Sequence, residues 1–151
     1  MPKINSKAPN FNLVSTNGSS YSLKNSIGKY VVLYFYPKDG TPGCTTQACD
    51  FRDAVKRIIA SKSNVFGVSL DSVESHKRFA DKNNLPFSLL SDESGEVSEA
   101  YDSLNNFMSF KSAKRNTFII DPDGKVAKIY LSVKPSTHSQ MVLNDLNQLQ
   151  N

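Results

Sequence analysis

An apolar run over residues 30–36 constrains the fold of this chain more than any other feature. The run is rich in β-branched and aromatic side chains, which is typical of a buried strand. Turn-forming residues follow at 37–40. A helical pattern begins directly after Pro42 and Gly43, with apolar residues returning every three or four positions. Cys44 is therefore expected in the first turn of a helix just beyond the C-terminal end of a central strand, where open α/β sheets usually bind ligands.

The predicted position of Cys44 favours a reactive thiol. A helix N-terminus carries the positive end of the macrodipole and several backbone N–H groups without helical partners. Both features stabilise the thiolate, which is the nucleophilic form of cysteine. A buried structural cysteine is the alternative that this position alone leaves open.

The rest of the chain alternates predicted strands and helices. An N-terminal β-hairpin is expected around Asn17-Gly18, followed by a helical turn at 23–27. Residues 102–114 show no clear periodicity and are expected to form a short loop. Further strands are predicted at 65–70, 87–90, 116–121 and 125–133, and further helices at 73–83, 94–101 and 138–150.

Length and composition indicate one ordinary globular domain. The chain has 151 residues and a net charge of +4, from 18 Lys and Arg against 14 Asp and Glu. These charges are interleaved along the sequence, so a solvated surface is favoured over a nucleic-acid interface. The longest apolar run is too short to span a membrane. No apolar leader is visible at the N-terminus, and a cytoplasmic location is expected.

The two cysteines do not form a recognisable metal motif. Cys44 and Cys49 are five residues apart, and His76 and His138 lie far from them in sequence. This spacing lacks the paired ligands of a zinc site. In a cytoplasmic protein, two cysteines then point to catalysis rather than to a structural disulfide. No metal is expected.

The segment around Cys44 resembles the active-site loop of the peroxiredoxins. Their motif is Pro, three residues, Thr, two residues and Cys, which here is Pro37, Thr41 and Cys44. With Cys49 five residues later, the segment is similar to the bacterioferritin-comigratory, or peroxiredoxin Q, branch. Arg115 precedes Asn-Thr-Phe-Ile-Ile-Asp, as the family's arginine precedes a late strand. The resemblance extends from about residue 8 to residue 149.

The resemblance implies both a fold and an activity. The fold would be a thioredoxin-like α/β domain over residues 1–151, with a central mixed β-sheet flanked by helices and an N-terminal β-hairpin. The activity would be thiol-dependent reduction of hydrogen peroxide and small organic hydroperoxides, an antioxidant role without metal, flavin or haem cofactor. Thioredoxin or a similar dithiol would be the reductant, and a monomer is expected.

The resemblance also assigns roles to individual residues. Cys44 would be oxidised to a sulfenic acid, which Cys49 would resolve as a disulfide. Pro37 would wall the site together with Pro42, and the Thr41 hydroxyl would contact peroxide and thiolate. Arg115 would stabilise charge on the thiolate and on the peroxide oxygens, which the backbone N–H groups of Gly43 and Cys44 would also bind.

Each assignment has a simpler alternative. The prolines could be ordinary turn and first-turn residues, Thr41 a helix cap, and Arg115 a surface cation. Cys49 could be a small buried apolar residue. The joint occurrence of these residues favours the catalytic interpretation.

A disulfide between Cys44 and Cys49 conflicts with a continuous helix. Five residues correspond to a rise of about 7.5 Å and a rotation of about 140°. A disulfide usually joins Cα atoms about 4.4–6.8 Å apart. The first turns of the helix would therefore have to unwind when the disulfide forms.

The chain departs from the family pattern in two places. Gln47 stands where many peroxiredoxins have Glu, so it can bond to Arg115 but cannot neutralise its charge. The short 102–114 region could alter how a substrate or a reductase docks.

A peroxide sensor or holdase on the same scaffold is one alternative function. A cysteine hydrolase is the other, and it would need a histidine beside Cys44.

Overall fold

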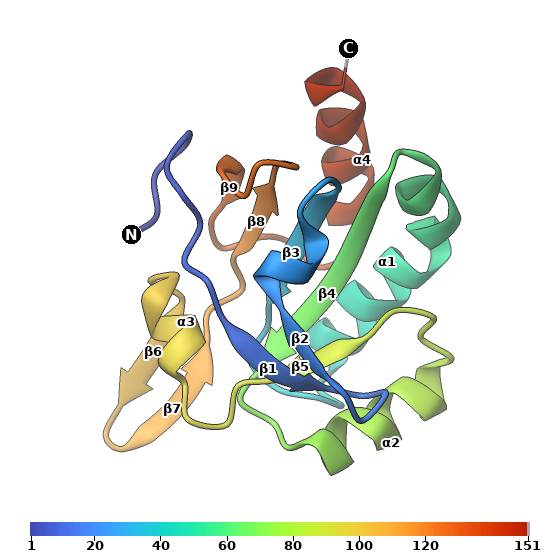
Figure 1. The fold of residues 1–151 in the computed structure, drawn as a ribbon. Helices are drawn as coiled ribbons and strands as arrows, with labels where there is room; N and C mark the ends of the chain where they lie inside the picture. Colours follow the sequence, from blue (N-terminus) through green and yellow to red (C-terminus); the bar gives the residue numbers. More distant parts are fainter. Residues whose placement is uncertain (151) are drawn as a thin grey trace.

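A seven-stranded mixed sheet forms the centre of the molecule in the computed structural model, which describes residues 1–150 (Figure 1). The strand order is β2-β1-β5-β4-β3-β8-β9. Its strands are β1 (Asn12–Ser15), β2 (Ser20–Ser22), β3 (Tyr30–Phe35), β4 (Ser63–Ser69), β5 (Leu89–Ser91), β8 (Thr117–Ile120) and β9 (Val126–Tyr130). The helices are the 3-10 turn η1 (Leu23–Ser26), α1 (Pro42–Ala60), α2 (Val73–Asn83), α3 (Glu96–Ala100) and α4 (His138–Leu149). None of the helices in the described residues is long and apolar enough to cross a membrane.

Strand β3 occupies the middle of the sheet, as its apolar sequence predicts. It pairs in parallel with β4 and antiparallel with β8, so both of its edges are bonded. Because side chains alternate along a strand, Val32, Tyr34 and Tyr36 face one side, and Val31, Leu33 and Phe35 face the other. All six are buried. An uninterrupted apolar run is what a strand covered on both faces requires.

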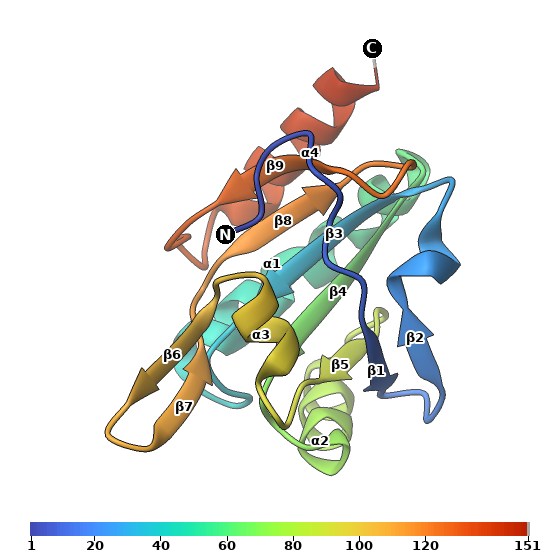
Figure 2. The same ribbon diagram turned by 60° about the vertical axis from the view of Figure 1, so that its left-hand side comes forward.

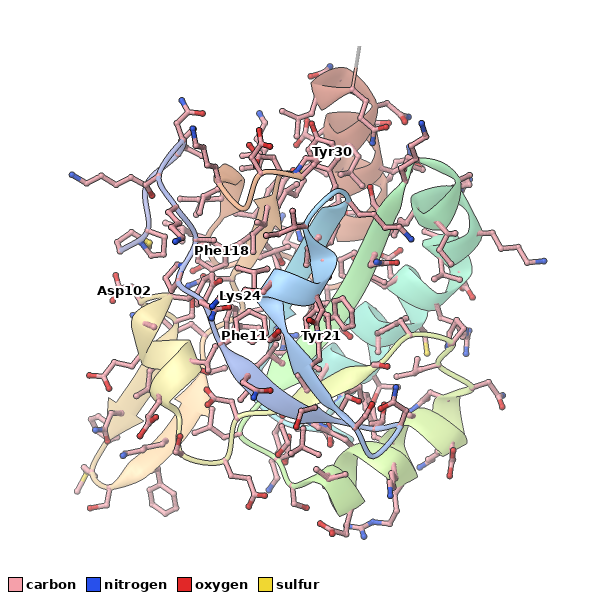
Figure 3. The ribbon with its side chains drawn as sticks, in the orientation of Figure 1. Phe11, Tyr21, Lys24, Tyr30, Asp102 and Phe118 are labelled. Atoms are coloured by element: carbon pink, nitrogen blue, oxygen red, sulfur yellow. The ribbon has the colours of Figure 1, made fainter. Side chains whose placement is uncertain are left out.

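Two separate cores cover the two faces of the sheet. The first lies under α1, α2 and α4, where the Tyr34 ring stacks on Phe51 with centroids 4.7 Å apart. The second lies under the N-terminal segment, η1 and α3, and contains Phe11 and Phe118 (Figure 3). Tyr101 joins these two rings through edge contacts. Helix α1 therefore covers only one face of the sheet.

The predicted N-terminal hairpin is confirmed. Strands β1 and β2 pair antiparallel with Leu13 opposite Tyr21. Gly18 in the connecting turn has φ 88°, a left-handed conformation that glycine adopts without strain. Strand β1 also pairs antiparallel with β5, which attaches the hairpin to the edge of the parallel strands.

The expected loop at 102–114 is wrong, because this region forms a β-hairpin. Strands β6 (Leu104–Phe107) and β7 (Phe110–Ala113) pair antiparallel as a separate two-stranded sheet. The hairpin extends away from the main sheet (Figure 2). Its turn uses Met108 and Ser109 at positive φ, without the Asn-Gly signal that marks the N-terminal hairpin. Neighbouring asparagines also have low strand propensity, so the sequence gives little sign of these strands.

Candidate active site

The first turn of α1 presents Cys44 with free backbone donors. Thr41 is the N-cap and Pro42 the first helical residue. Thr45 N bonds to Thr41 O at 2.9 Å and is the first amide of the helix with an intrahelical partner. The N–H groups of Gly43 and Cys44 therefore precede the helical ladder. Cys44 is only 1% exposed, so its sulfur lies in a nearly dry setting at the positive end of the helix.

Arg115 connects Cys44 to Gln47. Its Nη2 group donates to Cys44 Sγ at 3.3 Å, and its Nη1 group donates to Gln47 Oε1 at 2.7 Å. Gln47 is buried one turn after Cys44 on α1. The two arms of the planar guanidinium are thus held by two residues of one helix, which fixes its orientation. The amide does not cancel the positive charge that faces the sulfur.

The backbone around Arg115 is fixed by three separate elements. Val133 N bonds to Arg115 O at 2.9 Å, from the segment after β9. Asn116, the next residue, accepts from Phe35 N through its main chain and from Ser132 N through its side chain. Its Nδ2 group donates to Ser103 Oγ at 3.0 Å. Arg115 therefore projects from a rigid junction between β7 and β8.

The other predicted site residues lie around the same turn. Thr41 Oγ1 donates to Lys38 O at 2.9 Å, so the hydroxyl closes the loop and does not cap the helix. Pro37 is half-buried at the end of β3, and Pro42 is exposed. A Cβ atom on Gly43 would lie 3.2 Å from Arg115 Nη2 and 3.7 Å from Pro135 Cγ.

Pro135 is a neighbour of the site that the sequence did not indicate. It follows β9 and lies beside Gly43, on the side where the Arg115 guanidinium approaches. Its connection to the site depends on how the segment between β9 and α4 returns over the sheet. No local motif marks such a residue.

Tyr34 lies beneath the helix start in the first core. Burial raises the pKa of Tyr34 well above its ordinary value, and the nearby Cys44 adds to this increase. Its phenol is therefore neutral, and its hydroxyl has no hydrogen-bond partner within the described residues. Tyr34 and Cys44 belong to the same buried core.

Cys49 lies further along α1 with different neighbours. Both cysteines are free thiols. Cys49 is half-buried, and its Sγ lies 3.8 Å from Asn83 Oδ1 at the end of α2. An open hollow beside it is lined by Thr46, Asp50 and Ser136. Helix α1 is continuous between the two cysteines, so its first turns would have to unwind for the two sulfurs to bond.

Neither histidine is bonded to Cys44 in residues 1–150. His76 bonds to Asp39, which precedes α1, and to the main chain of β5. His138 packs edge-on against Phe51 and Tyr130 in the core. Burial lowers the pKa of His138 to about 4, so its ring is neutral near neutral pH. The nucleophile–base pair that a cysteine hydrolase needs is not formed by the described residues.

The sequence of this chain matches the model of the AhpC/TSA family over residues 4–129. The chain belongs to this family. Peroxiredoxin Bcp of Bacillus subtilis is 41% identical, over 97% of this chain and 96% of its own length. Chloroplastic Peroxiredoxin Q of Triticum aestivum is also 41% identical, over 93% of this chain and 65% of its own length. These relatives confirm the resemblance to the Bcp and Q branch.

Solved structures of the family confirm the thioredoxin-like fold. Peroxidoxin BcpB from Mycobacterium tuberculosis superimposes over the full length of both chains, with a TM-score of 0.94 and 30% identity. The bacterioferritin comigratory protein of Xanthomonas campestris, studied for its alkyl peroxide reduction activity, has a TM-score of 0.87 and 32% identity. It covers 93% of this chain, and 92% of its own chain is matched. The family's sheet and helices therefore extend over nearly the whole chain.

Proposed function

We propose that this chain is a thiol-dependent peroxidase that reduces hydrogen peroxide and small organic hydroperoxides through Cys44. The observation that carries the proposal is the buried Sγ of Cys44 at the start of α1, 3.3 Å from Arg115 Nη2. A guanidinium and a helix N-terminus beside a sulfur form the electropositive setting in which reactive cysteines occur. The family and the activity studied in the Xanthomonas campestris relative support the same chemistry.

In the first step, the Cys44 thiolate attacks one oxygen of the peroxide. An S–O bond forms as the O–O bond breaks, so the sulfur is oxidised and the peroxide is reduced. The departing oxygen takes up a proton and leaves as water or an alcohol. Arg115, bonded to the Cys44 sulfur, and the free N–H groups of Gly43 and Cys44 would stabilise the negative charge on the oxygens. Thr41, whose hydroxyl closes the loop before the helix, would contact the peroxide, and Pro37 would limit water.

In the second step, Cys49 resolves the sulfenic acid. Its thiolate attacks the Cys44 sulfur, an S–S bond forms as the S–O bond breaks, and the departing hydroxide takes up a proton to leave as water. Since both cysteines lie in α1, the first turns of this helix must unwind before the sulfurs meet. The open hollow beside Cys49 gives a dithiol reductant, thioredoxin or a similar protein, a way to reach the disulfide. We propose that a monomer acts in this way in the cytoplasm.

The decisive experiment is peroxide-dependent oxidation of NADPH, coupled through thioredoxin and its reductase. Wild type, Cys44→Ser and Cys49→Ser are compared. Turnover lost in Cys44→Ser and reduced in Cys49→Ser supports the two-cysteine cycle. Turnover lost only in Cys44→Ser would make Cys49 structural. If the wild-type thiol is not oxidised by one equivalent of peroxide, the proposed function is wrong.

Hydrogen exchange tests the opening of α1 separately. The amides of residues 44–51 are expected to exchange faster in the disulfide form than in the reduced form, because the helix start has unwound. Helix α4 (His138–Leu149), which contains neither cysteine, serves as the internal control. Equal protection of residues 44–51 in both forms would contradict an unwinding step.

A further inference from the structure

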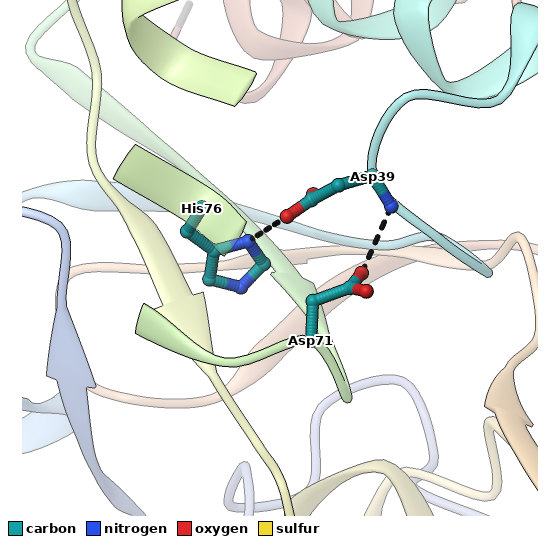
Figure 4. A group of neighbouring side chains, drawn as sticks. All are labelled: Asp39, Asp71 and His76. Atoms are coloured by element: carbon teal, nitrogen blue, oxygen red, sulfur yellow. Dashed lines mark hydrogen bonds and ion pairs between the residues drawn. The ribbon is translucent and has the colours of Figure 1, made fainter. Parts of the chain in front are cut away.

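The loop between β3 and α1 is attached to the start of α2 through Asp39 (Figure 4). Its carboxylate accepts from the Tyr36 hydroxyl at 2.6 Å and from Ser75 Oγ at 2.9 Å. It also lies 2.7 Å from His76 Nδ1. The Asp39 amide donates to Asp71 Oδ2 at 2.9 Å. One residue of the active-site loop thus makes four bonds to its surroundings.

Both ring nitrogens of His76 face acceptors. Nδ1 faces the Asp39 carboxylate, and Nε2 lies 3.0 Å from the main-chain oxygen of Leu90 in β5. Nδ1 also lies 3.3 Å from the Tyr36 hydroxyl. The His76 ring therefore joins the active-site loop to strand β5 through its two nitrogens.

This pair is shielded from water. The His76 side chain is fully buried, and the Asp39 side chain is 5% exposed. A buried contact of this kind is sensitive to the loss of either partner, because the remaining polar group is left without its hydrogen bond.

Three groups from the packed elements surround the contact between His76 and Asp39. From the end of β3 comes the Tyr36 phenol, whose pKa burial raises well above its ordinary value, so it remains neutral. After β4 comes Asp71, which accepts from Ser69 Oγ and from the Asp39 amide. β5 contributes a main-chain oxygen.

The oxygens of Asp39 and Asp71 and the nitrogen of His76 lie within 4.8 Å of one another. Each of the three side chains has protein hydrogen-bond partners. The cluster is therefore a closed hydrogen-bond network rather than a set of free metal ligands.

We propose that His76 is a positioning residue for the peroxidase reaction, acting through Asp39 on the loop before α1. The inference rests on the proposed function. Lys38 O accepts the Thr41 hydroxyl, so the loop that Asp39 anchors is bonded to the N-cap of the helix that carries Cys44. The pair favours the closed site in which Cys44 faces Arg115. Its loss shifts the balance towards the opened site in which Cys44 reaches Cys49.

The positioning role is tested on the two steps of the reaction in Asp39→Asn, His76→Gln and the double variant. Rapid quench and mass spectrometry of trapped thiols separate Cys44 oxidation from disulfide formation. We expect Cys44 oxidation to slow by about ten-fold in each variant, as displaced reacting groups do. Disulfide formation is expected to stay constant or to accelerate. Because both changes break one pair, the double variant should lose no more than the single variants.

His138→Gln is the matched control, since this buried histidine does not contact Asp39. Its oxidation rate should equal that of wild type. Oxidation rates within about two-fold of wild type in the Asp39 and His76 variants would overturn the proposal. So would equal slowing of both steps, or additive losses in the double variant. Should His76→Gln fail to fold, Asp39→Asn carries the test.

Hydrogen exchange distinguishes a failure of this inference from a failure of the proposed function. Faster exchange of the amides of residues 38–44 in Asp39→Asn is expected with no peroxide present. Unchanged exchange would overturn the loop anchor even in an active peroxidase. A wild type that does not react with peroxide would instead overturn the proposed function.

Discussion

Arg115 donates to the sulfur of Cys44 across 3.3 Å, while its second arm is held by the buried amide of Gln47. The contact joins the helix start to the junction before β8, which are far apart in sequence. It gives the thiol a cation whose orientation the fold fixes before any substrate arrives. Preorganised charge of this kind needs little rearrangement during reaction.

Replacing Arg115 by Lys should slow Cys44 oxidation by about 100-fold, because an ammonium cannot bond to Gln47 and Cys44 in the same planar arrangement. Stopped-flow measurement of peroxide consumption gives the second-order rate constant. Lys114→Ala removes the exposed neighbouring cation and should leave the rate unchanged. A wild-type rate in Arg115→Lys would show that charge alone is sufficient.

Gly43→Ala should separate stability from activity. The added Cβ would lie 3.2 Å from Arg115 Nη2 and would displace the guanidinium from the sulfur. We expect Cys44 oxidation to slow by about ten-fold. Alanine is favoured over glycine in a helix by up to about 1 kcal/mol, but the displaced guanidinium strains its bonds to Gln47 and Cys44, so the free energy of unfolding should change little. Thermal melts and peroxide kinetics on one preparation test both effects, and a simultaneous fall in stability would contradict this account.

His138 should make the protein less stable in acid. Its folded pKa of about 4 is below the value of about 6.5 for an exposed histidine, so the unfolded chain binds the proton first as pH falls. The contribution is fully present above about pH 6.5 and is lost progressively towards pH 4, by up to about 3 kcal/mol. Urea unfolding across this range measures it. His138→Gln should show a smaller loss over the same interval, and an identical pH dependence would exclude His138 as the cause.

The tip of the β6–β7 hairpin should tolerate polar substitution. Phe107 and Phe110 are 71% and 82% exposed, so their replacement by Ser removes little buried surface. The free energy of unfolding should change by less than about 0.5 kcal/mol. Phe118→Ala, at a fully buried position, should cost about 3–5 kcal/mol. Chemical denaturation of the three variants makes the comparison, and a large loss at the tip would indicate that these rings are covered.

The sequence predicted the parts of the site that depend on local order. The buried strand, the turn and the helix start placed Cys44 correctly, because strand and helix periodicities are visible in one short stretch. Arg115 was predicted from the family motif, and the structure places it against Cys44. The bond between Thr41 and Lys38 was not foreseen, since a hydroxyl at a helix start has several possible partners.

Features that join distant segments could not be predicted. The sequence indicates Asp39 only as a turn residue and His76 only as one of two isolated histidines. Their contact depends on how α2 packs beside the end of β3, which no local pattern specifies. The β6–β7 hairpin was missed because its turn and its asparagine-containing strands lack the usual signals.

The two-sided sheet separates the requirements of folding from those of redox chemistry. Cys44 and Ala48 belong to the core under α1, whereas Leu33 and Phe118 belong to the core on the opposite face. The proposed unwinding at the start of α1 would disturb the first core and leave the second intact. Substitutions on the far face should therefore change the melting temperature with little effect on the reduction potential of the disulfide proposed between Cys44 and Cys49. Substitutions beneath the helix start should shift that potential, because they alter the stability of the dithiol form relative to the disulfide form.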